Sequence, residues 1–216
     1  MPNEKQILFM KYFKEKKVIL WDFDGVIMDS MPVRNKGFEL VLKEFPNEQV
    51  ELLMQFHLKN GGLSRYVKFR HFFEEIRGEE VTEEEIKEWA QKFSGIMREE
   101  LVQPALLIKD SLNFIKENYK KFNMHIVSGS DGEELRYLCE KLEISRYFIS
   151  IHGSPVPKKE LVHSLLIKHE YKGDDTILIG DSINDYEAAE INEIDFCGYN
   201  NEQLKELKTF YIESFT

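Results

Sequence analysis

The part of the chain that follows Pro104 constrains the fold most strongly, because short apolar runs alternate there with amphipathic helical patterns. The apolar runs predict strands at 122–127, 147–151, 176–180 and 194–197. The patterns between them predict helices at 108–120, 131–142, 158–170 and 183–191. Such an alternation is typical of a parallel sheet covered by helices. The run from Val18 to Trp21 adds a first strand, and its continuous apolar residues indicate burial on both faces.

The segment between this first strand and Pro104 has a purely helical pattern. Apolar residues recur three and four positions apart at 33–45, 48–58, 64–77 and 83–100, and no strand pattern interrupts them. Thr82 and Glu85 have the spacing of a capping box, so we interpret the acidic cluster at 79–85 as a helix start rather than a metal site. A further amphipathic pattern at 3–16 predicts one short helix.

These patterns together predict an α/β fold with two parts. We expect a Rossmann-like, doubly wound parallel sheet core formed by residues 1–31 and 105–216. We expect an inserted α-helical cap domain at residues 32–104, placed directly after the acidic end of the first strand.

Composition excludes several classes of partner. The chain of 216 residues has a net charge of −10, which disfavours a nucleic acid, and it has no apolar stretch long enough to cross a membrane. Its two cysteines, Cys139 and Cys197, fit buried thiols in a reducing compartment, so we expect a cytoplasmic protein. The sequence does not indicate an oligomeric state.

Polar residues follow three of the expected strands at the point where each strand ends. They are Asp22, Asp24 and Gly25, then Ser128, Gly129 and Ser130, and finally Asp181 and Asp185. Ligands bind beyond the carboxyl ends of parallel strands, so we expect these residues to converge in one crevice. Carboxylates that gather in a partly desolvated site repel one another unless a cation compensates. Oxygen ligands without His or Cys favour Mg²⁺ over Zn²⁺.

Four short segments, in this order, resemble the motifs of the haloacid dehalogenase-like hydrolase superfamily. They are Asp22-Phe23-Asp24-Gly25-Val26, Ser128 after a strand, a lysine at the start of a later helix, and Gly180-Asp181-Ser182-Ile183-Asn184-Asp185. The helical insertion resembles the small cap of the phosphoglycolate phosphatase and β-phosphoglucomutase branch. The resemblance extends from about residue 17 to residue 200.

The resemblance implies a role for each motif residue. Asp22 would be the nucleophile that forms an aspartyl-phosphate, and Asp24 would protonate the leaving oxygen and then deprotonate the attacking water. The implied Mg²⁺ ligands are the Asp22 carboxylate, the Asp24 main-chain carbonyl and Asp181, with Asp185 behind them. Ser128 would bind a phosphoryl oxygen, and Gly25, Gly129 and Ser130 complete the predicted phosphate and substrate contacts.

Two features leave alternatives open. The motif Pro157-Lys158-Lys159-Glu160 departs from the common form in which Pro follows Lys; we expect Lys158 to neutralise the phosphoryl group, with Lys159 as the alternative. In the expected cap, Ser64 and Arg65 resemble a Gly-x-Ser-Arg segment that reaches the substrate, and Lys68 shares a helix face with Arg65. His57, Arg70 and His71 rank below these residues as candidates for the same role, and we expect them to be exposed helix residues.

The expected function is a Mg²⁺-dependent phosphatase that hydrolyses a small phosphorylated metabolite. The nearest alternative is a phosphomutase, but its relatives usually place a His where this chain has Arg34. A dehalogenase would leave Asp24 and the second acidic cluster without a role. The alternative from another class is a catalytically silent binding or regulatory module. The sequence does not identify the metabolite.

Overall fold

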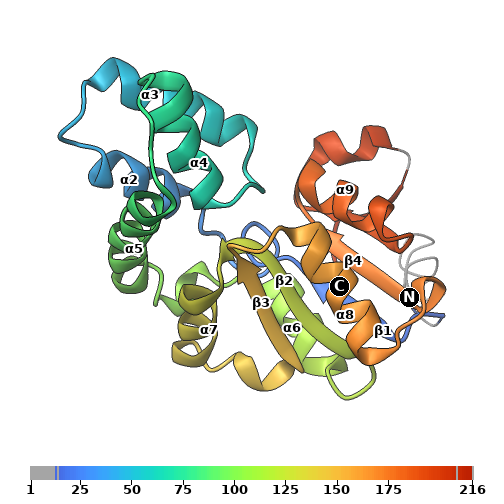
Figure 1. Cartoon of the computed structure of the whole chain (residues 1–216). Coiled ribbons are helices and arrows are strands. Elements are labelled where there is room, and N and C mark those ends of the chain that lie inside the picture. The colour runs from blue at the N-terminus through green and yellow to red at the C-terminus, as the bar shows by residue number, and fades with distance from the viewer. Residues whose placement is uncertain (1–12, 14, 208, 216) are drawn as a thin grey trace.

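A computed structural model describes residues 13, 15–207 and 209–215, and its centre is a parallel sheet (Figure 1). The strands are β1 (Val18–Trp21), β2 (Asn123–Asp131), β3 (Ser150–Ser154), β4 (Thr176–Gly180), β5 (Asp195–Tyr199) and β6 (Phe210–Ile212). Among the described residues they form one six-stranded sheet in the order β3-β2-β1-β4-β5-β6. This order is that of a doubly wound Rossmann-like fold, so the predicted fold class is confirmed.

Strand β1 lies in the middle of the sheet and pairs with segments that are far away in the sequence. Val18 is in register with Asn123 of β2 on one side and with Thr176 of β4 on the other. All four residues of β1 are buried, as the continuous apolar run predicts.

Helices cover both faces of the sheet, and the alternation of side chains along β1 shows how. The helices are α6 (Lys109–Asn118), α7 (Gly132–Lys141), α8 (Lys158–His169) and α9 (Ile183–Ile191). Ile19 and Trp21 belong to the apolar cluster that includes α6 and α7. Val18 and Leu20 belong to the cluster that includes α8 and α9. The period of two along a strand therefore supplies one core on each side of the sheet.

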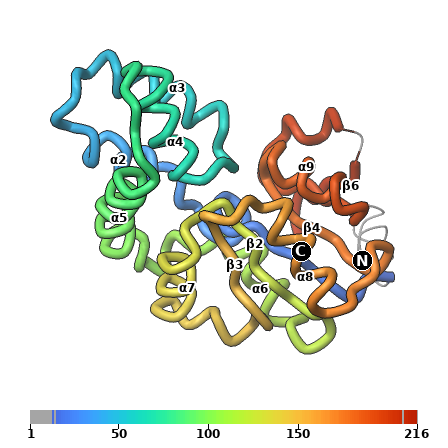
Figure 2. Tube along the Cα trace, in the orientation of Figure 1, coloured from blue at the N-terminus to red at the C-terminus, as the bar shows by residue number. Residues whose placement is uncertain are grey.

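The chain between β1 and β2 is helical, as predicted. It forms α2 (Met31–Val41), α3 (Asn47–Lys59), α4 (Arg65–His71), a π-helical turn at Phe72–Ile76, and α5 (Glu83–Glu100). These helices form a group apart from the sheet (Figures 1 and 2), on the side toward which the arrowhead of β3 points in Figure 1. The predicted capping box at the start of α5 is confirmed, because Thr82 and Glu85 exchange both hydrogen bonds.

An aromatic cluster holds this helical group together. The ring of Phe38 in α2 lies 5.4 Å from Phe69 in α4 and 4.4 Å from Phe93 in α5, measured between centroids. All three rings are fully buried. Packing between aromatic rings therefore joins three helices that are short individually.

The structure corrects several element boundaries. The expected strand at 147–151 lies instead at Ser150–Ser154, and a 3-10 turn at Ser145–Tyr147 includes the first expected position. The expected helix at 64–77 changes to a π-helix after His71, and the wider turn buries both Phe72 and Phe73. Further 3-10 turns lie at Pro104–Leu106, Gly173–Asp175 and Glu202–Leu207.

The C-terminal end of the chain contributes to the sheet and to the core. The helix expected at 3–16 lies outside the described residues, except at its last few positions. At the other end, β6 pairs with β5, and the buried ring of Phe215 lies 5.5 Å from Trp21. The C-terminal segment that the sequence left unassigned thus packs on the core.

Two further expectations concern the thiols and the membrane. Cys139 and Cys197 are both free and buried, as predicted. None of the helices in the described part of the chain has the length and hydropathy required to cross a bilayer.

Candidate active site

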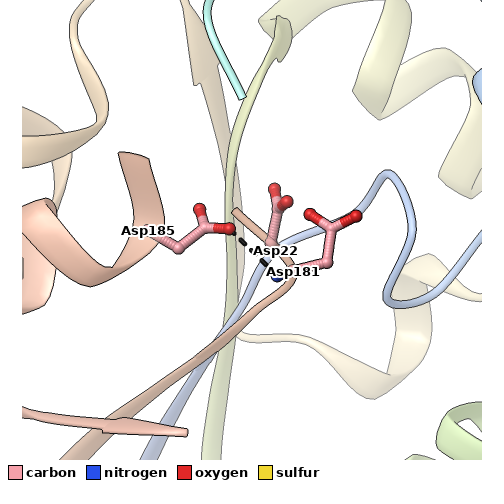
Figure 3. Close-up of side chains that lie close together, drawn as sticks. All are labelled: Asp22, Asp181 and Asp185. Atoms are coloured by element: carbon pink, nitrogen blue, oxygen red, sulfur yellow. Dashed lines mark hydrogen bonds between the residues drawn. The ribbon is translucent and has the colours of Figure 1, made fainter. Parts of the chain in front are cut away.

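Three carboxylates meet at the carboxyl end of the sheet. Asp22 follows β1, Asp181 follows the neighbouring strand β4, and Asp185 lies in the first turn of α9 (Figure 3). Each offers an oxygen, and these oxygens all lie within 4.8 Å of one another. The convergence follows from the parallel pairing of β1 with β4, which places the ends of both strands side by side.

A buried lysine contacts this cluster. Lys158 is the first residue of α8 and is 4% exposed; its Nζ lies 2.8 Å from Asp22 Oδ1 and also forms an ion pair with Asp185 Oδ1. Lys159 is exposed. Of the two lysines that the sequence offered, the structure brings only Lys158 to the carboxylates.

The electrostatics of the cluster favour a further cation. Burial, followed by repulsion from Asp185, raises the pKa of Asp22, although Lys158 opposes the shift. Burial and the neighbouring Asp22 likewise raise the pKa of Asp181 well above its ordinary value. One lysine therefore does not neutralise three carboxylates. The set of oxygen donors fits a hard divalent cation such as Mg²⁺.

Asp185 is bound differently from the other two carboxylates. Its Oδ2 accepts hydrogen bonds from the backbone amides of Asp181 and Ser182 at 3.1 and 3.0 Å, the first of which is the dashed line in Figure 3. Its Oδ1 is held by Lys158. Both oxygens are therefore engaged by the chain itself. This arrangement suits a residue that orients the loop and the lysine behind the site.

Asp24 points to a second set of partners. Its Oδ1 accepts a hydrogen bond from Ser30 and one from Arg34 Nε at 2.7 Å, while Oδ2 accepts one from Ser130. Burial by itself would raise the pKa of Asp24, but the Arg34 charge and these hydrogen bonds outweigh it and lower the pKa. These contacts favour the ionised form of Asp24, and its side chain lies outside the cluster of Asp22, Asp181 and Asp185.

Glycines allow close approach around the carboxylates. Gly25 has φ +75°, and a Cβ at this position would overlap the Asp181 carboxylate.

Ser128 and Ser130 are buried where the pairing of β2 with β3 becomes irregular, between Val127 and Asp131. The Ser130 amide donates to Ser128 Oγ at 3.1 Å. Ser128, Gly129 and Ser130 line the same cavity as Asp22 and Asp181.

The predicted cap residues have partners within the chain. Arg65 is 4% exposed; it donates to Ser94 Oγ at 2.7 Å and to Glu134 Oε1 at 2.8 Å. Ser64 caps α4, and its Oγ accepts a hydrogen bond from the Val67 amide. Arg65 lines the cavity, whereas Ser64 is not among its lining residues. No sequence pattern pointed to Glu134, which is fully buried on α7 and also accepts a hydrogen bond from Arg34.

Part of the cavity wall consists of residues that the sequence patterns do not predict to lie there. The cavity has a volume of about 380 Å³ and lies between the sheet edge and α2, α3 and α4. His57, expected to be an exposed helix residue, is 1% exposed and lines it, so that expectation is wrong. Arg70 and His71 are partly exposed and do not line the cavity. The side chain of Lys68 lines the cavity and is buried.

Comparison with known proteins identifies the family. A family model described as haloacid dehalogenase-like hydrolase matches residues 19–199 of this chain. The chain belongs to the haloacid dehalogenase-like hydrolase family. The predicted recognition is therefore confirmed, and the predicted enzyme class, a phosphoric monoester hydrolase of this family, is supported by the names of its relatives.

Relatives of this hydrolase include a curated enzyme and several solved structures. A phosphoglycolate phosphatase of Aliivibrio fischeri is 21% identical over 184 residues, which are 82% of this chain and 81% of that protein. CbbY of Rhodobacter sphaeroides, solved in complex with xylulose-(1,5)bisphosphate, has a TM-score of 0.73 at 13% identity and covers 93% of this chain and 95% of its own.

A third relative concerns the metal. The HAD-hydrolase YfnB of Bacillus subtilis, solved bound to magnesium, has a TM-score of 0.67 at 18% identity and covers 92% of this chain and 95% of its own. At these identities the structural likenesses show the fold of the hydrolase. The acidic cluster of Asp22, Asp181 and Asp185 is compatible with metal binding.

Proposed function

We propose that this hydrolase cleaves the phosphate ester of a small metabolite and that Asp22 carries the phosphoryl group between the two steps. The observation that carries the proposal is the position of Asp22: its carboxylate shares one buried site with Asp181 and contacts Lys158. A nucleophile, a place for a cation and a fixed positive charge thus lie together at the end of the sheet. Phosphoryl transfer needs these three elements.

The reaction follows from the carboxylates in two steps. In the first step an Asp22 oxygen forms a bond to phosphorus, the bond from phosphorus to the ester oxygen breaks, and Asp24 gives its proton to the leaving alkoxide. In the second step water attacks the aspartyl-phosphate, Asp24 takes a proton from that water, and Asp22 is released as a carboxylate. Phosphate and the alcohol are the products.

The hydrogen bonds of Asp24 bear on the first step. A donor must be protonated, whereas Arg34 and the two serines hold Asp24 in its ionised form. Binding of the ester therefore has to weaken the contact between Arg34 and Asp24 before the proton can be given. The second step needs an ionised Asp24, which is the form that these hydrogen bonds favour.

The remaining residues have supporting roles in the proposal. Lys158 would balance the charge of Asp22 and of the transferring phosphoryl group, since its own pKa is raised by Asp185 and Asp22 despite burial. Ser128 and the backbone amides near Gly129 and Ser130 would bind phosphoryl oxygens. The helices of residues 32–104 would act as a cap that excludes bulk water.

Asp22 and Asp181 would hold a Mg²⁺ ion, together with the main-chain carbonyl of Asp24. Their repelling, buried carboxylates make the site suited to a divalent cation. A bound Mg²⁺ supplies neutralisation of negative charge on the phosphoryl oxygens. Asp185 would support this site by fixing the loop of Asp181 and the position of Lys158.

The cavity and the curated relative support the substrate class. A volume of about 380 Å³ suits a small phosphorylated molecule rather than a protein or nucleic acid. The Aliivibrio fischeri relative is a phosphatase, which supports hydrolysis over the phosphomutase alternative. Membership of a hydrolase family argues against a silent binding module. A cytoplasmic location stays a prediction.

The experiment is hydrolysis of para-nitrophenyl phosphate with and without Mg²⁺, by the wild type and by two matched variants. Asp22→Asn removes the nucleophile, and Asp29→Asn changes an exposed carboxylate in the same segment. We expect turnover that depends on Mg²⁺, is lost in Asp22→Asn and is retained in Asp29→Asn. Activity that survives in Asp22→Asn would remove Asp22 from its proposed role.

A further inference from the structure

One wall of the cavity carries buried positive side chains with N–H donors that the proposed chemistry does not use. Lys68 of α4 is 3% exposed, and its Nζ donates to the Gly61 carbonyl at 3.1 Å. Among the described residues no carboxylate lies within ion-pair distance of this ammonium group. Arg34 contributes a second group, since its Nη2 is buried and has no hydrogen-bond partner in the described part of the chain. Both residues line the cavity that contains Asp22.

A buried ammonium group without a neighbouring negative charge is energetically costly. The pKa of Lys68 reflects this cost. Burial, followed by repulsion from Arg34, lowers the pKa of Lys68 to about 7, while Asp24 opposes the shift. An anion bound beside Lys68 would restore the charged form and satisfy the free donors. Buried lysines are rare without such a partner.

The neighbouring His57 helps to define what the wall can bind. Its Nε2 lies 2.8 Å from Asn35 Oδ1, an atom that only accepts, so Nε2 carries the proton and Nδ1 is an acceptor. Burial and the nearby Lys68 lower the pKa of His57 to about 3, which keeps the ring neutral. Contacts to an anion therefore fall to Lys68 and Arg34, and not to His57.

We propose that Lys68 and Arg34 form a second anion-binding subsite and that the substrate is a phosphate ester whose alcohol part carries a second anionic group. This inference rests on the proposed function, because it assumes that the ester phosphate lies at Asp22. Arg34 also bonds to Asp24, so the subsite adjoins the group that would protonate the leaving oxygen. A carboxylate or a phosphate, either of which offers oxygens to a lysine and an arginine, fits this position.

The bond from Lys68 to Gly61 suggests a different role, in which the lysine only braces the loop that it touches. The two roles predict different kinetics. A brace would affect every ester to the same extent, whereas an anion subsite affects only esters with a second negative charge. The decisive quantity is therefore the ratio of kcat/KM values for a charged ester and its neutral counterpart.

The kinetic test uses two matched pairs of esters. Phosphoglycolate and its carboxamide, phosphoglycolamide, differ in one carboxylate charge; ethylene glycol bisphosphate and ethylene glycol monophosphate differ in one phosphate. Lys68→Met keeps the aliphatic stem and removes the charge, Lys68→Arg keeps the charge, and Lys36→Met removes an exposed charge from α2 outside the cavity. The pair that wild type discriminates more strongly shows whether the anion is a carboxylate or a phosphate.

We expect wild type to prefer the charged member of at least one pair. Lys68→Met should lower that preference by roughly 10-fold or more, as expected for loss of a charge-assisted hydrogen bond, while Lys68→Arg keeps most of it and Lys36→Met leaves it unchanged. Equal losses for both members of each pair in Lys68→Met would overturn the subsite. Wild-type activity without any preference would overturn it too, while leaving the proposed function intact.

Calorimetric binding separates the subsite from the hydrolytic function. Wild type and Lys68→Met are titrated with the same esters in the Asp22→Asn background, where turnover is not required. If no ester is hydrolysed by the parent enzyme but the charged ester binds more tightly than its neutral partner, and Lys68→Met removes the difference, the subsite stands and the proposed function fails. Equal affinities, or no binding of either ester, would overturn the subsite.

Discussion

The loop between α3 and α4 contacts the core at the carboxyl end of the sheet. We predict that catalysis depends on this contact. Gly62 lies in the loop between α3 and α4, and its carbonyl accepts a hydrogen bond from Asn184 Nδ2 at 3.0 Å. A Cβ added to Gly62 would lie 2.9 Å from Asn184 Cβ and 3.1 Å from Ser182 Cβ, and still closer to Ser182 Oγ. Glycine is therefore the residue that lets this loop reach the core.

Gly62→Ala should force the loop to withdraw. Restoring an ordinary carbon contact of about 3.4 Å requires a shift of about 0.5 Å from Asn184, and more from the Ser182 hydroxyl. A displacement near 1 Å can lower a catalysed rate by roughly 100-fold. We expect kcat/KM to fall by about 10- to 100-fold, which is about 1.4 to 2.7 kcal/mol. The loop can swing outward, so the free energy of unfolding should change by less than about 0.5 kcal/mol.

Gly61→Ala is the matched control, because a Cβ there meets nothing within 4 Å. Steady-state hydrolysis of one phosphate ester, measured beside thermal unfolding, separates closure from stability. Gly129→Ala tests the same contact from the core, since its Cβ would overlap the Gly62 carbonyl. The predicted role of this loop contact in catalysis is wrong if Gly62→Ala retains the activity of Gly61→Ala, or if it loses activity only because it unfolds.

Three further predictions follow from buried charges. Glu134→Gln should lower the free energy of unfolding by about 3 kcal/mol, because it removes the carboxylate that pairs with buried Arg65 and one of the two that pair with buried Arg34. The exposed Glu133→Gln should change it by less than about 0.5 kcal/mol, and urea unfolding measures both. Lys68→Met should raise stability at pH 7 by about 1 kcal/mol or more. Burial lowers the pKa of Lys68 to about 7, so above that pH the unfolded chain binds more protons than the folded chain. The stability advantage of Lys68→Met over wild type should therefore shrink as the pH rises toward 10. An unchanged difference in the free energy of unfolding between pH 7 and 9 contradicts this. Asp185→Asn should raise the Mg²⁺ concentration required for half-maximal activity by about 10- to 100-fold, because Asp185 holds the Asp181 amide and Lys158. A Mg²⁺ titration of activity that matches wild type would refute this prediction.

Local sequence patterns were sufficient to predict the fold and the residues that follow the strand ends. The apolar run of β1 and the alternation after Pro104 predict the parallel sheet, and the rule for strand ends brings Asp22 and Asp181 together. Lys158 was predicted from the resemblance to the family's lysine motif, with Lys159 as the alternative. Its position at the site has a structural reason, because it begins α8 and the preceding strand β3 ends at the same edge of the sheet.

Contacts between distant helices could not be predicted in this way. The partners of Arg65 and Arg34 meet at Glu134, which lies on α7 and, by its helical position alone, resembles any glutamate in a first turn. The burial of His57 and Lys68 depends on how α3 and α4 face the sheet. Helical periodicity identifies an apolar face, but it does not reveal which polar residue is enclosed by another element.

The central position of β1 has a consequence for synthesis of the chain. This strand leaves the ribosome before either of its neighbours in register, which begin at Asn123 and Thr176. Translation must continue through the whole helical insertion, and then through β4, before both edges of β1 are paired. A nascent chain stalled before residue 176 would expose one edge of this apolar strand, which makes that stretch of elongation the period of greatest exposure to aggregation and to chaperones.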